Sequence, residues 1–304
     1  MIAMEQLVSQ GKPLDMRAEA LGELRESNGL LGDADALRRQ MADDGYLFFR
    51  GLLDRDKVES ARAEMLGRVA AEDGLDPSAP LLDGKLRENA RVGFRPDLTR
   101  KSVALRDLLF DGEIMAFFTT FLGGEVRHFD YIWLRSVSPG RGTPPHGDSV
   151  FMNRGTLDLF TAWTPLGDID TRLGGLIVLE NSHKLEHIRE AYGRLDVDTY
   201  CENRDGATVH SVPDIESWFG QISSNPVELR EDLGGRWLTT DFRMGDLLVF
   251  SMFTLHASLD NQTERHLRLS SDTRYQLMSE PVDERWIGED PIAHGPEAKV
   301  GIIC

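Results

Sequence analysis

Cysteine is scarce in this chain of 304 residues, where only Cys201 and Cys304 occur. Two cysteines cannot build a disulfide framework or a cysteine-rich zinc site. Residues 1–17 contain neither the basic segment nor the apolar segment of a secretory signal. We therefore expect a cytoplasmic protein.

Positive charge and long apolar runs are also in short supply. The 34 Lys and Arg residues are outnumbered by 51 Asp and Glu residues, which gives a formal net charge of −17. Such a chain lacks the basic surface that a phosphate backbone requires, so nucleic acid is not the expected partner. The longest nearly apolar run, residues 247–259, contains Ser, Thr and His and is shorter than the roughly 18 residues of a membrane span. We expect no membrane partner.

The first part of the chain has the pattern of a helix, a strand and a second helix. Leu37 and Met41 lie four residues apart in 33–44, as on one face of a helix, and Gly45 ends that segment. Residues 46–50 read as a short strand. Asp54 is a suitable N-cap for a helix that reaches residue 71.

Further along, one more helix is predicted before the pattern changes to strands. Residues 105–122 are predicted to be helical up to Gly123 and Gly124. The segments after it are short, apolar and separated by Gly, Pro, Asn or Asp, which is typical of antiparallel β structure. The predicted strands are 126–137, 149–152, 157–163, 176–180, 247–255 and 267–276. Residues 196–238 interrupt this series, and we expect them to form an insert that covers one face as a lid.

A histidine and an aspartate stand two residues apart in the middle of the β region. On a strand, His146 and Asp148 would point to the same side, so both could bind one metal ion. The pair alone is weak evidence, because such spacing also occurs by chance in surface turns.

A second histidine and an arginine strengthen the metal hypothesis. The apolar run that begins at residue 247 leads to His256, which we expect at the edge of a sheet. Arg268 follows twelve residues later. Arg268, Ser270, Asp272 and Arg274 alternate with less polar residues, so one face of this strand could point into a cavity. A buried arginine there needs an anion, best a carboxylate. Two histidines and one carboxylate are the ligand set of non-haem Fe(II), and the arginine could anchor a 2-oxo acid.

Motifs along most of the chain resemble the phytanoyl-CoA dioxygenase family of Fe(II)/2-oxoglutarate oxygenases. The motifs that carry the resemblance are Asp44-Gly45-Tyr46, Arg50-Gly51, His146-Gly147-Asp148, Trp163-Thr164-Pro165-Leu166, Gly174-Gly175-Leu176, Asn181-Ser182-His183-Lys184, Gly245-Asp246 and His256-Ala257-Ser258.

The resemblance implies a mainly β fold with flanking helices, a double-stranded β-helix or jelly roll of the cupin kind. It implies one oxygenase domain over 1–304, with a mainly helical support in 1–125 and the β-helix core in 126–280. It also implies that His146, Asp148 and His256 hold Fe(II), and that Arg268 binds 2-oxoglutarate with Ser258 and Trp163 beside it. The expected reaction is the hydroxylation of a small molecule with O₂, releasing succinate and CO₂.

The chain departs from the family pattern at two positions. The arginine usually follows the distal histidine by eleven residues, and here the spacing is twelve, so Arg265 stays open as an alternative to Arg268. Asn181 stands where family members often have glycine. Asp148 is present, whereas related halogenases lack this carboxylate, so hydroxylation is favoured over halogenation.

Four side chains are the candidates for the substrate pocket: Tyr131, Trp133, Phe151 and Asn153. We expect a monomer or a homodimer. Two other classes of function compete with the oxygenase. One is a non-catalytic β-barrel that binds a metal or ligand, and the other is a zinc peptidase, because residues 183–187 match H-x-x-E-H.

Overall fold

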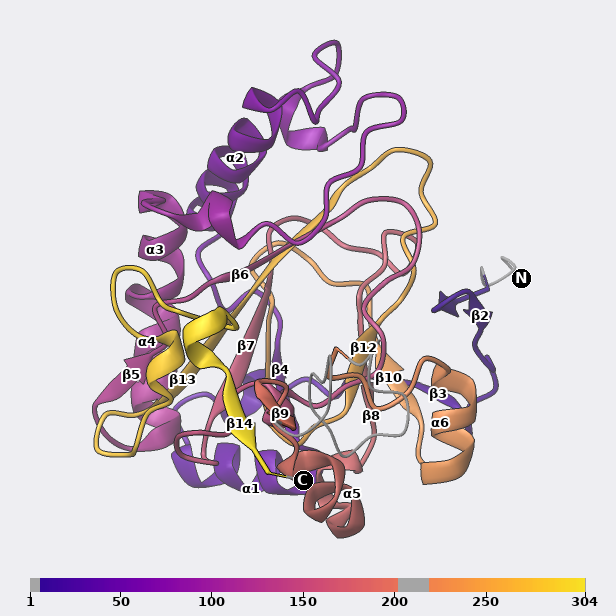
Figure 1. The fold of residues 1–304 in the computed structure, drawn as a ribbon. Helices are drawn as coiled ribbons and strands as arrows, with labels where there is room; N and C mark the ends of the chain where they lie inside the picture. Colours follow the sequence, from indigo (N-terminus) through magenta and orange to yellow (C-terminus); the bar gives the residue numbers. More distant parts are fainter. Residues whose placement is uncertain (1–5, 202–218, 304) are drawn as a thin grey trace.

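Two β-sheets face each other in this computed structural model, which describes residues 6–201 and 219–303 (Figure 1). The larger sheet has the order β4-β11-β7-β13-β5, and β6 pairs with β13 beside β5. Its strands are β4 (Tyr46–Phe49), β5 (Val126–His128), β6 (Trp133–Val137), β7 (Phe160–Pro165), β11 (Leu247–Ser251) and β13 (Arg268–Leu277).

The second sheet has the order β12-β8-β10-β3. Its strands are β3 (Leu21–Glu23), β8 (Leu176–Leu179), β10 (Trp237–Thr239) and β12 (His256–Ser258). Trp163 and Phe250 of the larger sheet share one apolar cluster with Val178 and Leu238 of the second sheet, so the two sheets form a sandwich. The mainly β fold predicted from the sequence is confirmed, and it is a double-stranded β-helix.

Two short strand pairs lie outside these sheets. They are β1 (Val8–Ser9) with β2 (Lys12–Pro13), and β9 (Thr199–Cys201) with β14 (Val300–Ile302). The second pair joins the C-terminal part of the chain to the beginning of the segment expected to be an insert. The predicted lid at 196–238 lies partly outside the described residues, and its last part contains α6 and most of β10, which belongs to the second sheet.

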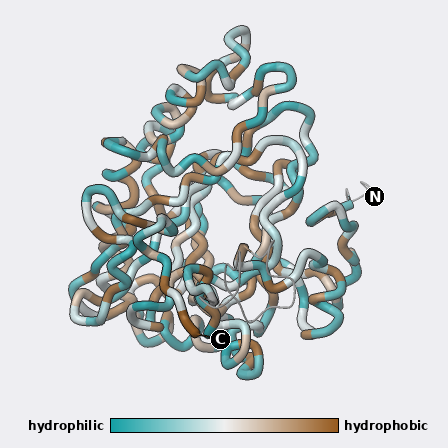
Figure 2. Tube along the Cα trace, viewed as in Figure 1, coloured by the Kyte–Doolittle hydropathy of each residue, from teal (hydrophilic) through white to brown (hydrophobic). Residues whose placement is uncertain are grey.

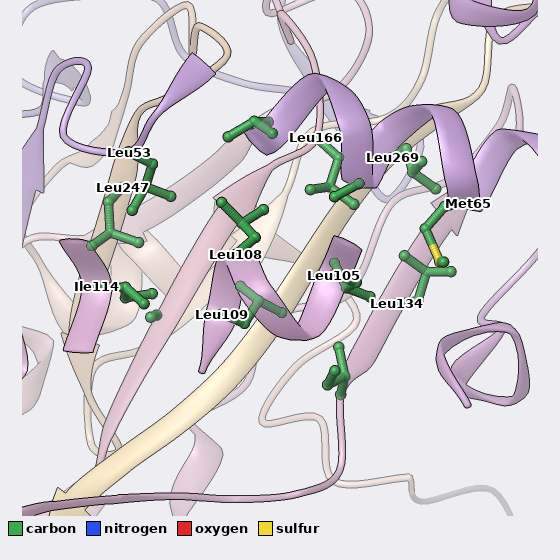
Figure 3. Close-up of a cluster of buried hydrophobic side chains, with 14 of the residues drawn as sticks. Leu53, Met65, Leu105, Leu108, Leu109, Ile114, Leu134, Leu166, Leu247 and Leu269 are labelled. Carbon is green, nitrogen blue, oxygen red and sulfur yellow. The ribbon is translucent and has the colours of Figure 1, made fainter. Parts of the chain in front are cut away.

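The N-terminal helices cover the outer face of the larger sheet. The helices of the described residues are α1 (Ala34–Asp44), α2 (Arg55–Ala71), α3 (Val103–Leu109), α4 (Gly112–Leu122), α5 (Glu186–Glu190) and α6 (Pro226–Leu233). Figure 3 shows Leu105 of α3 near Leu134 of β6, and Leu108 and Leu109 closer to Leu247 of β11; all five side chains belong to one buried cluster. Teal and brown segments alternate along the outer helices in Figure 2, as expected for helices that bury one side.

The predicted ends of the first helices are confirmed by their capping contacts. Asp54 accepts hydrogen bonds from the backbone of Asp56 and Lys57, which starts α2 as expected. Gly45 ends α1 with φ +77°, a conformation that a side chain disfavours. Here a Cβ atom would also stand 2.3 Å from Nδ1 of His183.

The single helix predicted over 105–122 is wrong, because the structure has two helices there. Gly112 has φ +61°, which interrupts the helical path, and Asp111 accepts a hydrogen bond from its backbone N–H. The break lets α3 and α4 take different directions, although both contribute to the same buried cluster.

Two strand predictions near the candidate site also need correction. Residues 148–150 form a 3-10 turn, so the strand predicted over 149–152 is absent. The strand predicted over 247–255 is too long: β11 ends at Ser251, residues 252–255 connect the two sheets, and β12 begins at His256. The hydrophobic pattern could not show that the chain passes from one sheet to the other here, because the residues in both sheets are apolar and buried.

No helix of the described residues is long and apolar enough to cross a membrane.

Candidate metal centre and active-site cavity

A backbone bridge between two distant segments brings the two histidines together. His146 and His256 exchange N–H···O hydrogen bonds of 3.0 and 2.9 Å. Asp148 begins the 3-10 turn two residues after His146. The ligand atoms of these three buried residues all lie within 4.8 Å of one another. The convergence predicted from the sequence is therefore present, although a turn and not a strand presents Asp148.

Each imidazole is oriented by a carbonyl group of its own segment. Nδ1 of His146 donates to the carbonyl of Pro144 at 2.8 Å, and Nδ1 of His256 donates to the carbonyl of Thr254 at 3.0 Å. The Nε2 atoms lie 3.8 and 3.9 Å from Oδ1 of Asp148. Burial lowers the pKa of both histidines, to about 3 for His146, where His256 adds to the effect. Both rings are thus neutral at pH 7, the form that binds metals.

The two carboxylate oxygens of Asp148 have different surroundings. Oδ2 accepts hydrogen bonds from Thr161 and, at 2.8 Å, from Nη2 of Arg274. Burial alone would raise the pKa of Asp148, but the guanidinium of Arg274 and the hydrogen bond from Thr161 hold it below its ordinary value. Oδ1 is turned toward the histidines and is available to a cation. Two imidazole nitrogens and one carboxylate oxygen on one side fit the donor set of non-haem Fe(II).

Arg268 lies buried at the start of β13 and lacks a carboxylate partner. Its Nη1 donates to the carbonyl of Gly174 at 2.8 Å, and its Nε has no hydrogen-bond partner. No Asp or Glu of the described residues forms an ion pair with it. Burial lowers its pKa to about 10, so the guanidinium is still charged at pH 7. A buried, unpaired guanidinium is a strong anion site.

The other candidate arginine has a different environment. Nη2 of Arg265 forms an ion pair of 2.7 Å with Asp76, at a partly exposed position before β13 begins. The longer turn between His256 and Arg268 therefore places Arg268 on the inner face of β13 and leaves Arg265 at the surface.

Trp163 and Ser258 lie on the walls between the sheets. Nε1 of Trp163 donates to the hydroxyl of Ser270 at 3.1 Å, and Ser270 is on the same face of β13 as Arg268. The hydroxyl of Ser258 accepts a hydrogen bond of 2.7 Å from the backbone of Thr143. Both residues are buried.

A cavity of about 500 Å³ opens beside His146 and Asp148. Two of the four predicted pocket residues, Trp133 and Phe151, line it. Tyr131 packs against Trp133, with ring centroids 4.6 Å apart, but does not line the cavity. Asn153 lines a different depression and donates to the carbonyl of Leu195 at 2.7 Å, because the 3-10 turn redirects the chain after Asp148.

Several residues of the site were not singled out from the sequence. Arg274 and Thr161 hold Asp148, and His294 lines the cavity from the C-terminal part of the chain. The alternation along β13 places Arg274 on the same face as Arg268, so the sequence pattern could have identified Arg274 as a residue of the site. No sequence pattern pointed to His294, which is positioned by a 2.8 Å hydrogen bond from its Nδ1 to Asp198.

The geometry contradicts the zinc-peptidase hypothesis. His183 lies in a 3-10 turn that ends at Lys184, and His187 lies in the separate helix α5. His183 bonds to the carbonyl of Ala42 at 2.9 Å. Among the described residues, the one group of three side chains able to hold a metal ion is His146, Asp148 and His256.

The fold and this site are those expected of an oxygenase built on a double-stranded β-helix. The model of the family Phytanoyl-CoA dioxygenase (PhyH) matches residues 41–269. The chain belongs to the phytanoyl-CoA dioxygenase family.

Two curated relatives carry the same description, 1-deoxypentalenic acid 11-beta-hydroxylase. The one from Streptomyces exfoliatus is 28% identical over 273 residues, which cover 86% of this chain and 87% of the relative. The one from Streptomyces arenae is 27% identical with the same coverage. The chain is therefore similar to hydroxylases along most of its length.

Solved structures share the fold at lower identity. The epimerase SnoN, in complex with Fe3+, alpha ketoglutarate and nogalamycin RO, is 22% identical with a TM-score of 0.55, over 86% of this chain and 95% of that chain. EctD from S. alaskensis is 18% identical with a TM-score of 0.55, over 98% of both chains.

Proposed function

We propose that this protein is an Fe(II)/2-oxoglutarate-dependent dioxygenase in which His146, Asp148 and His256 hold the iron. The observation that carries the proposal is the buried triad with its ligand atoms within 4.8 Å, next to a cavity. Membership in the phytanoyl-CoA dioxygenase family and similarity to two hydroxylases support hydroxylation of a small molecule. Iron with 2-oxoglutarate supplies O₂ activation, with release of succinate and CO₂.

Arg268 is the proposed anchor of 2-oxoglutarate. Its free Nε and its lack of a carboxylate partner support this role, whereas Arg265 already pairs with Asp76. Gly174, with φ +96°, turns its carbonyl toward Nη1 and thereby orients the guanidinium. Trp163 and Ser258 are proposed to line the same cosubstrate site.

The remaining residues of the site fix geometry and exclude water. Thr161 and Arg274 occupy Oδ2 of Asp148, so that Oδ1 alone faces the histidines. The guanidinium of Arg274 in turn lies 4.0 Å from the centroid of the Trp133 ring, which holds it in place. Trp133 and Phe151 give the cavity apolar walls, which suit an oxidation of a C–H bond away from water.

We further propose that the chain acts as one oxygenase domain in the cytoplasm, as a monomer or homodimer. Strands β3 and β4 from the N-terminal part pair within the two main sheets, which supports a single folding unit. The scarcity of cysteine supports a reducing compartment.

Anaerobic addition of Fe(II) and 2-oxoglutarate to the metal-free protein tests the proposal. We expect a weak visible charge-transfer band in the wild type, and its loss in His256→Ala. The matched control is His187→Ala, which removes a histidine outside the triad and should keep the band. A band that disappears in His187→Ala and survives in His256→Ala would contradict the assignment, as would the absence of any band in the wild type.

A further inference from the structure

A second depression adjoins the active-site cavity and is lined by three arginines. It has a volume of about 340 Å³, and it shares Phe94, Arg135 and Thr143 with the cavity beside the triad. The two additional arginines that line it are Arg91 and Arg141. Because the two hollows have walls in common, a molecule that reaches the triad can extend into the arginine-lined depression.

Backbone contacts place these arginines at fixed positions around the depression. Residues 91–95 run along β6: the backbone of Val92 donates to the hydroxyl of Ser138 at 2.7 Å, and Arg95 donates to the carbonyl of Leu134 at 3.2 Å. On the other side, the N–H of Gly140 donates to the carbonyl of Asn261 at 2.9 Å, next to Arg141. The arginines therefore stand on anchored loops.

Two of the three arginines that line this depression have no counterion in the described part of the chain. No Asp or Glu lines it, and within the described part of the chain neither Arg91 nor Arg141 takes part in an ion pair. The neighbouring carboxylate of Asp260 accepts backbone hydrogen bonds from Gln10, Gly11 and Gly142 instead. Only Arg135 has a counterion, Asp272, at 2.8 Å. Two exposed guanidinium groups without an ion pair therefore line this one depression.

The wall between the two hollows is aromatic. The guanidinium of Arg135 lies 5.2 Å from the centroid of the Phe94 ring, and Phe94 is itself an exposed aromatic side chain. Closer to the triad, Phe151 lies with its ring centroid 5.7 Å from that of His146. The path from depression to triad thus passes from cationic to apolar surroundings.

We propose that Arg91 and Arg141 bind an anionic oxygen group of the substrate, a carboxylate or a phosphate. The apolar body of that substrate then lies between Phe94 and Phe151, with the carbon to be oxidised next to the triad. Guanidinium groups bind both anions through paired N–H donors. This assignment rests on the proposed function, because it concerns the substrate of the same oxygenase.

Pairs of anionic and neutral compounds with the same apolar body test the assignment. One pair is 1-deoxypentalenic acid, the compound in the relatives' name, and its methyl ester. The other is a prenyl phosphate of similar size and its free alcohol. The measurement is the stimulation of succinate release by the Fe(II)- and 2-oxoglutarate-loaded enzyme as a function of compound concentration. We expect at least one anion to act at lower concentration than its neutral partner, and the pair that responds identifies the anion.

The double variant Arg91→Ala/Arg141→Ala should raise the half-saturating concentration of the responding anion about 10-fold or more, as the loss of a charge-assisted contact does. It should leave the neutral partner unchanged. The matched control is Arg39→Ala/Arg55→Ala, which removes two exposed arginines from α1 and α2 and should have no effect.

Three results would overturn the assignment while the charge-transfer band is present: equal stimulation by anion and neutral partner, no stimulation by either anion, or equal half-saturating concentrations in the two double variants. Absence of the band in the wild type would instead refute the proposed function, so the two failures are distinguishable.

Discussion

The two faces of β13 differ sharply in chemistry: one face is apolar and the other carries buried charge. On the outer face, Leu269 and Tyr275 lie in the apolar cluster under the N-terminal helices. On the inner face, Arg268 and Arg274 carry buried charge toward the proposed cosubstrate and metal sites. Because successive side chains of a strand point to opposite faces, β13 contributes to the main hydrophobic core on one side and to the proposed active site on the other. Mutations on the outer face should alter stability, whereas those on the inner face should alter ligand binding.

The largest expected effect on stability comes from the outer face. Leu269→Ala should lower the free energy of unfolding by about 2–5 kcal/mol, because it leaves a cavity in a closely packed cluster. Denaturant unfolding measures this change. The Km for 2-oxoglutarate of the folded variant should stay at the wild-type value, and a large increase would show that the two faces are not independent.

An ion-pair network around Asp198 lies at the edge of the active-site cavity, because His294, which lines the cavity, binds Asp198. Asp198 is fully buried and accepts hydrogen bonds from Arg285, Lys299 and His294. Burial would raise its pKa, but His294 and Lys299 hold it below the ordinary value. Its contribution to stability is therefore present above the unfolded-state pKa of about 4 and is lost as pH falls through the lower folded-state value.

Asp198→Asn should lower the free energy of unfolding at pH 7 by on the order of 2 kcal/mol, since Lys299 loses its counterion and Arg285 keeps only Asp283 and Asp196. The difference from wild type should shrink below pH 4. Thermal unfolding at pH 7 and at pH 3 measures both values. A difference that grows toward acid pH would contradict the direction given for this carboxylate.

On the inner face, Arg268→Met should raise the Km for 2-oxoglutarate about 10- to 100-fold through loss of a charge-assisted contact. The same change should not destabilise the protein, because it replaces an unpaired buried charge with an apolar side chain of similar length. Succinate release at varied 2-oxoglutarate and a thermal melt measure the two effects. A lower melting temperature with an unchanged Km would show that Arg268 is structural.

The smallest effect is expected at the neighbouring surface position. Arg265→Met breaks a partly exposed pair with Asp76 and should change neither the Km for 2-oxoglutarate nor, to any large extent, the melting temperature. It is the matched control for Arg268→Met. If Arg265→Met gave the larger increase in Km, the anchor would be Arg265.

Much of the site could be predicted because its signals are local. The spacing of His146 and Asp148 and the apolar run before His256 pointed to the triad, and the alternation after Arg268 pointed to an inner polar face. The capping residues Asp54 and Gly45 gave two helix ends for the same reason: a cap is a contact between near neighbours.

Other features could not be predicted, because contacts between distant segments decide them. The run after residue 247 is apolar on both sides of the sandwich, so only the packed sheets show that it crosses between them at residues 252–255. Asn153 leaves the cavity because the turn after Asp148 is not a strand. His294 reaches the cavity because Asp198 binds it from 96 positions away in the chain.

The sequence by itself determined the fold class, and it predicted the three residues of the proposed triad and the polar face of β13 that carries Arg268. Period-two alternation and short motifs can be recognised without any tertiary contact. The sequence also has Asn181 where family members often have glycine, and the φ of +59° at this position is one that asparagine tolerates. Only the tertiary structure separated Arg268 from Arg265, because burial and ion pairing depend on where the longer turn leaves each side chain. It alone also brought Arg91 and Arg141, fifty residues apart, to one depression beside the cavity.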